Sequence, residues 1–208
     1  MTQAPGAAHW EARYGDPHYH YGTEPNDFLR EQVGALPPGG RVLCIADGEG
    51  RNSVFLASMG FQVTAFDLAE AGVAKARRLA AEMGVPLDAQ VADAAHFPIG
   101  EGEWDGVVSI FAHMPPPLRV DLHRRVAVGL REGGVLLLEA YTPAQIGRGT
   151  GGPQVPEMTM NLATLRAELP GLEELHAAEF VRPVVEGPGH TGDGAVVQYV
   201  ARRAGGVS

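Results

Sequence analysis

Residues 41–52 read RVLCIADGEGRN, and this stretch decides the fold. Residues 41–46 form a short apolar run of the kind that makes a buried strand. Residues 47–50 are a glycine-containing loop, and residues 51–59 predict a helix that ends at Gly60. A strand that turns through glycines into a helix is typical of an α/β sheet. The start of such a helix also offers free backbone N–H groups to a ligand.

Strands and helices continue to alternate after this stretch. The further expected strands are 61–66, 87–92, 106–111 and 134–140. The further expected helices are 70–83, 118–130 and 160–169. This alternation favours right-handed crossovers and a doubly wound parallel sheet. Residues 172–185 and 195–202 both read as strands with no helix between them, which predicts an antiparallel hairpin with a connecting loop at 186–192.

The segment before the first strand predicts a lid and a helix. It is polar and aromatic as far as Tyr21, and Thr23 is the candidate cap of a helix that starts near Pro25. This helix is expected to run to about Leu36 and to stop at the Pro/Gly run that follows. The chain is thus predicted as one domain, 1–208, with an N-terminal lid and helix at 1–36 and an α/β core at 41–203.

The composition is that of an acidic globular domain. Hydrophobic residues make up 45% of the 208 residues and the formal net charge is −9, which disfavours a nucleic-acid partner. Cys44 is the one cysteine, so an internal disulfide and a Cys-rich zinc site are excluded. The apolar run 135–138 is too short to cross a membrane, and residues 1–8 lack the pattern of a signal peptide. We therefore expect a cytoplasmic protein without a membrane partner.

Three features fall at the carboxyl ends of predicted strands, where open α/β sheets bind ligands. They are the loop at 47–50, Asp67 after the second strand and Asp93 after the third. Asp67 follows the loop at about the distance of a ribose-binding acid in nucleotide folds. The loop lacks the third glycine of a dinucleotide fingerprint, and Asp47 and Glu49 would repel a pyrophosphate. An adenosine ligand without phosphate fits best, and S-adenosylmethionine is such a ligand with cationic groups.

Several short motifs carry a family resemblance. They are Trp10-x-x-Arg13-Tyr14, Tyr21-Gly22-x-x-Pro25-Asn26-x-Phe28-Leu29, Gly48-Glu49-Gly50-Arg51-Asn52, Asp67, Asp93-Ala94 and Trp104-Asp105. With them the chain resembles class I S-adenosylmethionine-dependent methyltransferases over nearly its whole length, and within them the small bacterial tellurite-resistance-like and thiopurine-methyltransferase-like group. The resemblance implies a Rossmann-like sheet of seven mostly parallel strands in the order 3-2-1-4-5-7-6.

The resemblance also implies a site for S-adenosylmethionine, with S-adenosylhomocysteine as the product. The backbone of Gly48 and Gly50 would pass the methionine part, Asp67 would hold the ribose hydroxyls, and Asp93 with the Ala94 N–H would read the adenine. The full set of expected cofactor-binding residues is Arg13, Tyr21, Gly22, Asp47, Gly48, Glu49, Gly50, Asn52, Asp67, Leu68, Asp93, Ala94 and Phe111.

The first motif departs from the family pattern. In the family an acid usually stands two residues before a glycine. In this chain Cys44 stands in place of the acid and Ala46 in place of the glycine. The contact to the methionine amine then falls to Asp47 or to water. Arg13 either pairs with the methionine carboxylate or is a solvated helix residue. The lid residues near Tyr21 are expected to order over the bound cofactor and to exclude water.

The methyl acceptor is expected at the same edge, beyond the fourth and fifth strands. The candidate catalytic residues are His113, His190 and Tyr141. Each histidine is a candidate base or orienting group, and the alternative for each is a loop-bracing imidazole. A metal site from these histidines and Glu139 has no spacing signature, so none is expected. Because a thiol or a chalcogen oxyanion needs little help from a base, a soft nucleophile of this kind is favoured as a small-molecule acceptor.

Other functions stay open at this point. The altered first motif leaves room for a protein that binds S-adenosylmethionine or S-adenosylhomocysteine without turnover. A nicotinamide-dependent oxidoreductase predicts the third loop glycine, which is missing. A methyltransferase of macromolecules is disfavoured by the size, the acidic charge and the lack of an added recognition domain.

Overall fold

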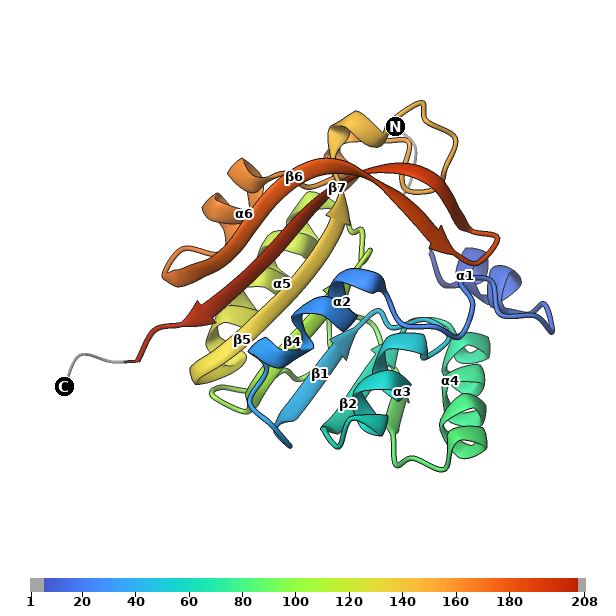
Figure 1. Ribbon diagram of the computed structural model, residues 1–208, viewed down its shortest axis with the longest axis horizontal. Coiled ribbons are helices and arrows are strands. Elements are labelled where there is room, and N and C mark those ends of the chain that lie inside the picture. The colour runs from blue at the N-terminus through green and yellow to red at the C-terminus, as the bar shows by residue number, and fades with distance from the viewer. Residues whose placement is uncertain (1–5, 206–208) are drawn as a thin grey trace.

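The computed structural model describes residues 6–205. Their seven strands form one sheet in the order β3-β2-β1-β4-β5-β7-β6 (Figure 1). Residues 1–5 and 206–208 of the predicted domain lie outside the described residues. The strands are β1 Arg41–Ile45, β2 Gln62–Asp67, β3 Asp88–Val91, β4 Trp104–Ile110, β5 Leu130–Tyr141, β6 Leu172–Glu186 and β7 His190–Arg203. β7 is antiparallel to both neighbours, and the pairs among β1 to β5 are parallel. The predicted strand order and the terminal hairpin are confirmed.

The register of the parallel strands assembles the edge at which the predicted site lies. β1 sits between β2 and β4, with Cys44 opposite Ala65 on one side and Val108 on the other. All three strands therefore end at the same edge. The backbone continues this pairing for one more step, since the Asp47 N–H donates to the Phe66 carbonyl at 3.1 Å.

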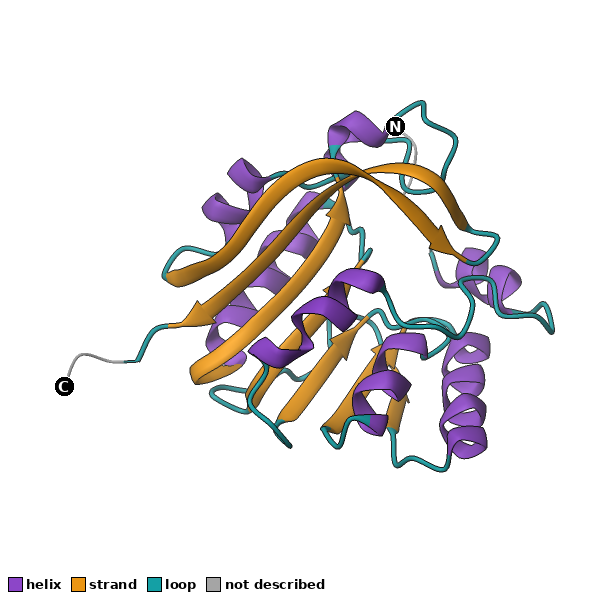
Figure 2. Cartoon of the chain, in the orientation of Figure 1, coloured by secondary structure: helices purple, strands orange, loops and turns teal. Residues whose placement is uncertain are grey.

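Helices cover both faces of the sheet (Figure 2). They are α1 Ala7–Tyr14, α2 Asp27–Gln32, α3 Arg51–Ser58, α4 Glu70–Met83, α5 Pro116–Gly129 and α6 Leu162–Glu168. One apolar core contains Phe28 of α2 and Leu56 of α3, and a second contains Leu122 of α5 and Leu165 of α6. The sheet is thus the middle layer of three, as the short apolar strands predict.

The helix expected from about residue 25 to 36 is shorter and has a different cap. α2 begins at Asp27, because the side-chain oxygen of Asn26 accepts the Leu29 N–H at 2.9 Å. Thr23, the expected cap, lies in a bend before it. The helix ends at Gln32 and continues as the 3₁₀ turn Val33–Ala35, where a glycine weakens the α-helix.

The terminal hairpin is longer than predicted. Pairing continues to Glu186 opposite His190, so the expected loop at 186–192 reduces to a turn of three residues. Gly187 makes this turn possible with a φ of +66°. The two strands bend over the carboxyl edge of the sheet (Figure 1), and the Gly189 N–H donates to the His20 carbonyl of the lid at 3.2 Å.

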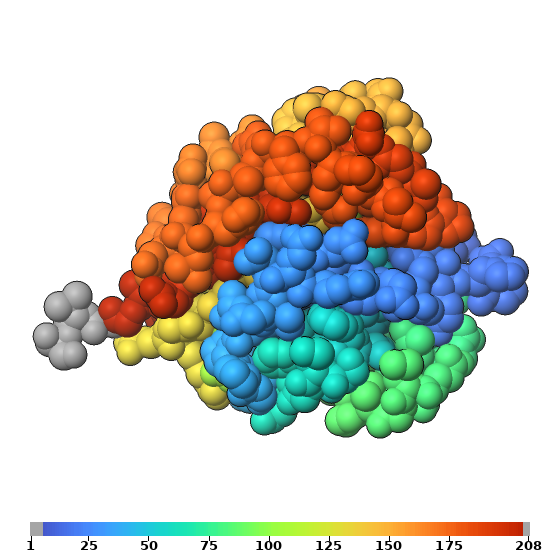
Figure 3. Space-filling model, in the orientation of Figure 1, coloured from blue at the N-terminus to red at the C-terminus, as the bar shows by residue number. Residues whose placement is uncertain are grey.

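The N-terminal segment lies between the hairpin and the first half of the sheet. In the space-filling view it occupies the band between the C-terminal strands and the helices α3 and α4 (Figure 3). α1 packs against α4, and the Lys75 ammonium of α4 donates to the His18 carbonyl at 2.6 Å. The N-terminal segment and the turn between β6 and β7 therefore meet over the edge at which the parallel strands end.

Candidate active site

A cavity of about 470 Å³ opens at the carboxyl ends of the strands. Ala46 and Phe66 form part of its lining on the sheet side, Trp10 and Tyr14 line it from the lid, and Met158 lines it from the loop after β5. The volume falls within the range of roughly 300–1,000 Å³ that small-molecule sites occupy.

Two glycines of the first loop have different roles. Gly48 lines the cavity with a φ of +62°, and a Cβ there would lie 2.8 Å from the Tyr14 hydroxyl. The lid thus packs directly on the loop backbone. Gly50 does not line the cavity, and a Cβ there would meet the Cβ of Ala76 at 2.5 Å. Gly50 therefore allows α3 to approach α4, and the cavity does not reach it.

Asp67 ties the first loop to the end of β2. One carboxylate oxygen accepts the Gly48 N–H and the other accepts the Ala69 N–H, both at 2.9 Å. Burial raises the pKa of this carboxyl. Asp67 lines the cavity, and each oxygen keeps acceptor capacity beyond its one backbone partner. The carboxylate is consequently held rigidly and can still accept hydroxyl groups from a ligand.

Asp47 is a buried acid at the start of the first loop. The Ser53 hydroxyl donates to its carboxylate. Burial raises the pKa of Asp47 to about 7, with a further contribution from Asp67 that the Ser53 hydrogen bond opposes. Asp47 lines the cavity, so a cation bound there would favour its ionised form.

Glu49 fixes the lid, the segment of residues 7–22, through hydrogen bonds to its backbone. One carboxylate oxygen accepts the N–H groups of His20 and Tyr21 at 2.8 and 3.2 Å. The other accepts from the Lys75 ammonium at 2.6 Å, and this ion pair is buried. Glu49 belongs to the cavity lining, but its polar atoms are already used to fix the lid to α4.

The lid presents an aromatic wall to the cavity. Trp10 stacks on Tyr14 with ring centroids 5.7 Å apart, and the Arg13 guanidinium lies 5.1 Å from the Trp10 ring. Arg13 also donates to the Tyr21 hydroxyl at 2.9 Å. Gly22 does not line the cavity, because it lies on the hairpin side of the lid against Gly187.

The end of β3 supplies the opposite wall. Asp93, Ala94 and Leu68 all line the cavity there. Asp93 Oδ1 accepts the Ala95 N–H at 2.8 Å, while the Arg125 guanidinium binds the Ala94 carbonyl at 2.5 Å. Leu68 is one of the exposed large apolar residues of the chain. This wall therefore combines a fixed carboxylate with an apolar surface.

His113 is braced at both ring nitrogens. Nδ1 lies 2.9 Å from the Met158 carbonyl, and Nε2 accepts the Tyr141 N–H at 3.3 Å. This pattern requires the proton on Nδ1. Burial lowers the pKa of His113 to about 4. The ring lines the cavity, yet no nitrogen is left to take a proton from a substrate.

Tyr141 supports the cavity from behind. It is absent from the lining, and its ring lies nearly parallel to those of Phe111 and His113 at centroid distances of 4.5 and 5.7 Å. Its buried hydroxyl has no hydrogen-bond partner in residues 6–205, and burial raises its pKa. Phe111 itself lines the cavity with a φ of +53°, which is strained for a bulky residue.

His190 closes the cavity from the hairpin. Its ring packs on Tyr21 at 4.5 Å and edge-on to Phe111 at 4.8 Å. Nδ1 is buried without a hydrogen-bond partner in the described part of the chain and lies 3.9 Å from Glu186 Oε2. Nε2 forms no hydrogen bond with the residues that the structure describes either. Burial lowers the pKa of His190, although Glu186 opposes this effect.

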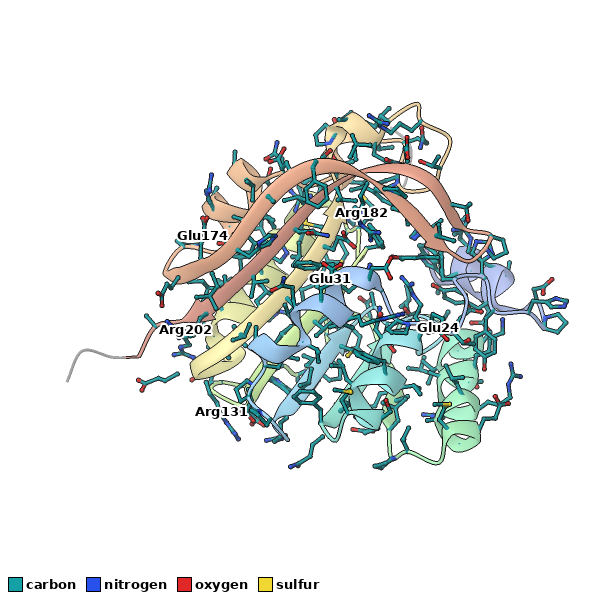
Figure 4. All side chains as sticks on the ribbon, viewed as in Figure 1. Glu24, Glu31, Arg131, Glu174, Arg182 and Arg202 are labelled. Carbon is teal, nitrogen blue, oxygen red and sulfur yellow. The ribbon has the colours of Figure 1, made fainter. Side chains whose placement is uncertain are left out.

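A buried polar network lies behind His190. Arg182 forms a bidentate ion pair with Glu139 at 2.9 and 2.7 Å. The Asn26 side-chain amide donates to Glu139 at 2.6 Å and to Glu186 at 2.8 Å. Arg51 completes it with a 2.5 Å contact to Glu186. Figure 4 shows Arg182 on the inner side of the bent hairpin, above α2.

The structure gathers most of the sequence-predicted residues in one cavity. Those that line it are Arg13, Tyr21, Asp47, Gly48, Glu49, Asn52, Asp67, Leu68, Asp93, Ala94, Phe111, His113 and His190. Three that do not line it are Gly22, Gly50 and Tyr141. Sequence reasoning missed the roles of Arg51 and Tyr14, which stood inside the quoted motifs. It also missed Glu186, whose position depends on the hairpin bend and has no local signal.

Residues 6–205 show neither a metal-binding cluster nor a membrane-spanning helix. No group of three or more His, Cys, Asp or Glu side chains there is arranged to hold a metal ion. Among the same residues, each helix is too short or too polar to traverse a lipid bilayer.

Comparisons with known proteins agree with this geometry. Residues 42–134 match a family model described as a methyltransferase domain. The chain is 37% identical over 123 residues to a ubiquinone biosynthesis O-methyltransferase of Xanthomonas campestris. The aligned region covers 57% of this chain and 50% of that protein. The chain spans 38% to 50% of the length of the curated relatives that it matches.

Solved structures extend the likeness to the whole fold. The structure of TehB from Haemophilus influenzae superposes with a TM-score of 0.69 at 19% identity, covering 95% of this chain and 66% of that one. A structure described for the conversion of a disulfide bond into a thioacetal group during echinomycin biosynthesis gives a TM-score of 0.77 at 19% identity, covering 97% and 93%. Residues 42–134 therefore resemble a methyltransferase domain in sequence, and residues 6–205 have the fold of structures described as S-adenosylmethionine-dependent methyltransferases.

Proposed function

We propose that this chain transfers a methyl group from S-adenosylmethionine to a small molecule. The observation that carries the proposal is the continuous cavity, which joins the first loop and the acids after β2 and β3 to the aromatic side formed by Phe111 and His190. A methyl donor and an acceptor must lie together in one water-poor space, because enzymes of this kind act mainly by positioning the two.

The charged groups of the lining fit the cofactor. Asp47 would accept from the ammonium of the methionine part, and Arg13 would pair with its carboxylate. Asp67 would hold the ribose hydroxyls, and Asp93 and Ala94 would contact the adenine beside Leu68. When bound, the cofactor supplies a methyl group on a positively charged sulfur. The lid residues held by Glu49 would keep water from this group.

The acceptor would enter on the side of Phe111 and His190. A soft nucleophile such as a thiol or a chalcogen oxyanion could react there without a base. A hydroxyl compound is the other candidate, and both the unengaged Nε2 of His190 and the likeness to an O-methyltransferase favour it. His113 and Tyr141 would shape this side of the cavity, since their polar atoms either are used or lie outside it.

Calorimetric titration of the purified full chain tests the proposal. S-adenosylmethionine, S-adenosylhomocysteine and NADH would be titrated in parallel. We expect both sulfur nucleotides to bind with micromolar affinity and NADH not to bind. Binding of NADH alone would support an oxidoreductase. If neither S-adenosylmethionine nor S-adenosylhomocysteine bound, the proposed function would be refuted. Binding without labelled-methyl transfer to any acceptor in a broad small-molecule screen would favour the non-catalytic alternative.

A further inference from the structure

The hairpin turn sets a buried carboxylate against a buried imidazole. Glu186 ends β6, His190 begins β7, and the two residues are paired next to the turn. They are 4% and 7% exposed, and Glu186 Oε2 lies 3.9 Å from His190 Nδ1. This separation is too long for a direct hydrogen bond, so the carboxylate acts on the ring through its electric field.

The polar network keeps Glu186 ionised. Arg51 contacts one carboxylate oxygen at 2.5 Å, and the Asn26 amide and Arg182 donate to the other at 2.8 and 3.2 Å. Burial raises the pKa of Glu186, but His190, Arg51 and Arg182 outweigh burial and hold the pKa at about 2. Glu186 therefore carries a full negative charge at neutral pH.

This charge selects the position of the proton on the neutral imidazole. A lone pair on Nδ1 would face the carboxylate in a buried place, where repulsion is poorly screened. An N–H on Nδ1 is attracted instead, which leaves the lone pair on Nε2. Nε2 has no hydrogen-bond partner within residues 6–205, and His190 lines the cavity beside Phe111. His113 contrasts with it, because both nitrogens of that ring are engaged.

We propose that Glu186 is a positioning residue that presents the free Nε2 of His190 to the methyl acceptor, and that the acceptor is a hydroxyl compound. The inference rests on the proposed function and deepens it. Methyl transfer to a hydroxyl forms a C–O bond and breaks the C–S bond, whose electron pair stays on sulfur. His190 Nε2 takes the hydroxyl proton, and the Glu186 carboxylate stabilises the resulting imidazolium. A thiolate arrives without a proton and makes no use of this pair.

The proton position is measured directly by nitrogen NMR of the full chain labelled with ¹⁵N-histidine. His190→Gln identifies the His190 signals among those of the other histidines. We expect a protonated Nδ1 and an unprotonated Nε2 in the wild-type protein with S-adenosylhomocysteine bound. Glu186→Gln should remove this preference, while Glu186→Asp should retain more of it. Glu173→Gln, an exposed position on the same strand, is the matched control and should change nothing. A wild-type ring protonated on Nε2 would overturn the proposal even if every variant failed to fold.

Labelled-methyl transfer to phenol and to thiophenol tests the acceptor class. His190→Gln should lower methylation of phenol by about 100-fold or more, the usual contribution of a general base, with the affinity for S-adenosylmethionine retained. Glu186→Gln should lower it less, and neither change should lower methylation of thiophenol. Methylation of thiophenol alone, or an equal loss with both acceptors, would refute the proposal. Failure of the sulfur nucleotides to bind at all would instead refute the proposed function.

Discussion

Asp47 shows how a single loop residue can couple ligand binding to pH. Its pKa of about 7 results from burial and from Asp67, which together exceed the effect of the Ser53 hydrogen bond. A cation in the cavity favours the carboxylate, so binding of S-adenosylmethionine should release a proton near neutral pH. We predict that its affinity rises between about pH 6 and 8 in the wild-type protein and is weaker and nearly flat in Asp47→Asn. Calorimetry in two buffers of different ionisation heat measures the released proton, and equal heats in both would contradict the prediction.

The same residue predicts how stability changes with pH. Because the folded-state pKa of Asp47 lies above that of an unfolded aspartate, the native state binds more protons between about pH 4 and 7. The contribution of Asp47 to the free energy of unfolding therefore falls as pH rises through this window. We expect Asp47→Asn to be more stable than the wild type at about pH 8 and to lose this advantage at about pH 4. Urea denaturation at both pH values measures the difference, which would be the same at both if Asp47 had an ordinary pKa.

Asp67 has a structural role in the first loop and a proposed role in binding the cofactor. Its carboxylate fixes the Gly48 and Ala69 N–H groups and still has acceptor capacity for ribose hydroxyls. Asp67→Asn should weaken binding of S-adenosylmethionine by about 1–3 kcal/mol, the scale of leaving polar groups unpaired. Asp88→Asn, at the opposite end of the neighbouring strand, should leave affinity unchanged. Unaltered affinity in Asp67→Asn would remove this residue from the ribose site.

At the scale of elements, the sequence predicted most of what regular patterns determine. The central strands follow from short apolar runs, and Gly60 and Gly84 end their helices as expected. The start of α2 was misplaced because Thr23 and Asn26 are both good caps, and only the tertiary contacts of Asn26 with Asn52 and Glu139 decide between them. The length of the hairpin was missed because a Gly/Pro turn reads like a longer loop.

The lid is the element whose attachment depends on one side chain. Glu49 accepts the N–H groups of His20 and Tyr21 and pairs with Lys75, so Glu49→Gln should loosen residues 7–22. We predict faster amide hydrogen exchange of this segment in the variant, and partial recovery when S-adenosylhomocysteine is bound. Glu24→Gln, which changes an exposed carboxylate close to the lid (Figure 4), should leave exchange unchanged. Equal exchange in Glu49→Gln and the wild type would refute the role of this carboxylate.

At the scale of the whole molecule, the site depends on residues that are far apart in the chain. Asn26 contacts Glu139 and Glu186, which follow it by 113 and 160 residues. No local pattern marks these three residues as neighbours, and the sequence alone suggests for Glu139 only a metal site that lacks a spacing signature. Asp67 and Asp93, which are proposed to hold the cofactor, can be picked out from the sequence because each lies at the end of a predicted strand. The network behind His190 exists only once the hairpin has bent over the sheet.

This network predicts a large stability difference between two arginines of the same hairpin. Arg182 is buried against Glu139 on the inner side, whereas Arg202 pairs with Glu173 at the exposed end near the C-terminus (Figure 4). Arg182→Met should destabilise the fold by about 3–5 kcal/mol, because it leaves buried Glu139 without its cation. Arg202→Met should have a much smaller effect, since water replaces its partner. Urea denaturation measures the free energy of unfolding of both variants. Adding Glu139→Gln to Arg182→Met should restore part of the lost stability, because it removes the buried negative charge that Arg182 neutralises. Similar effects of the two single changes would mean that the network contributes nothing specific to holding the hairpin over the cavity.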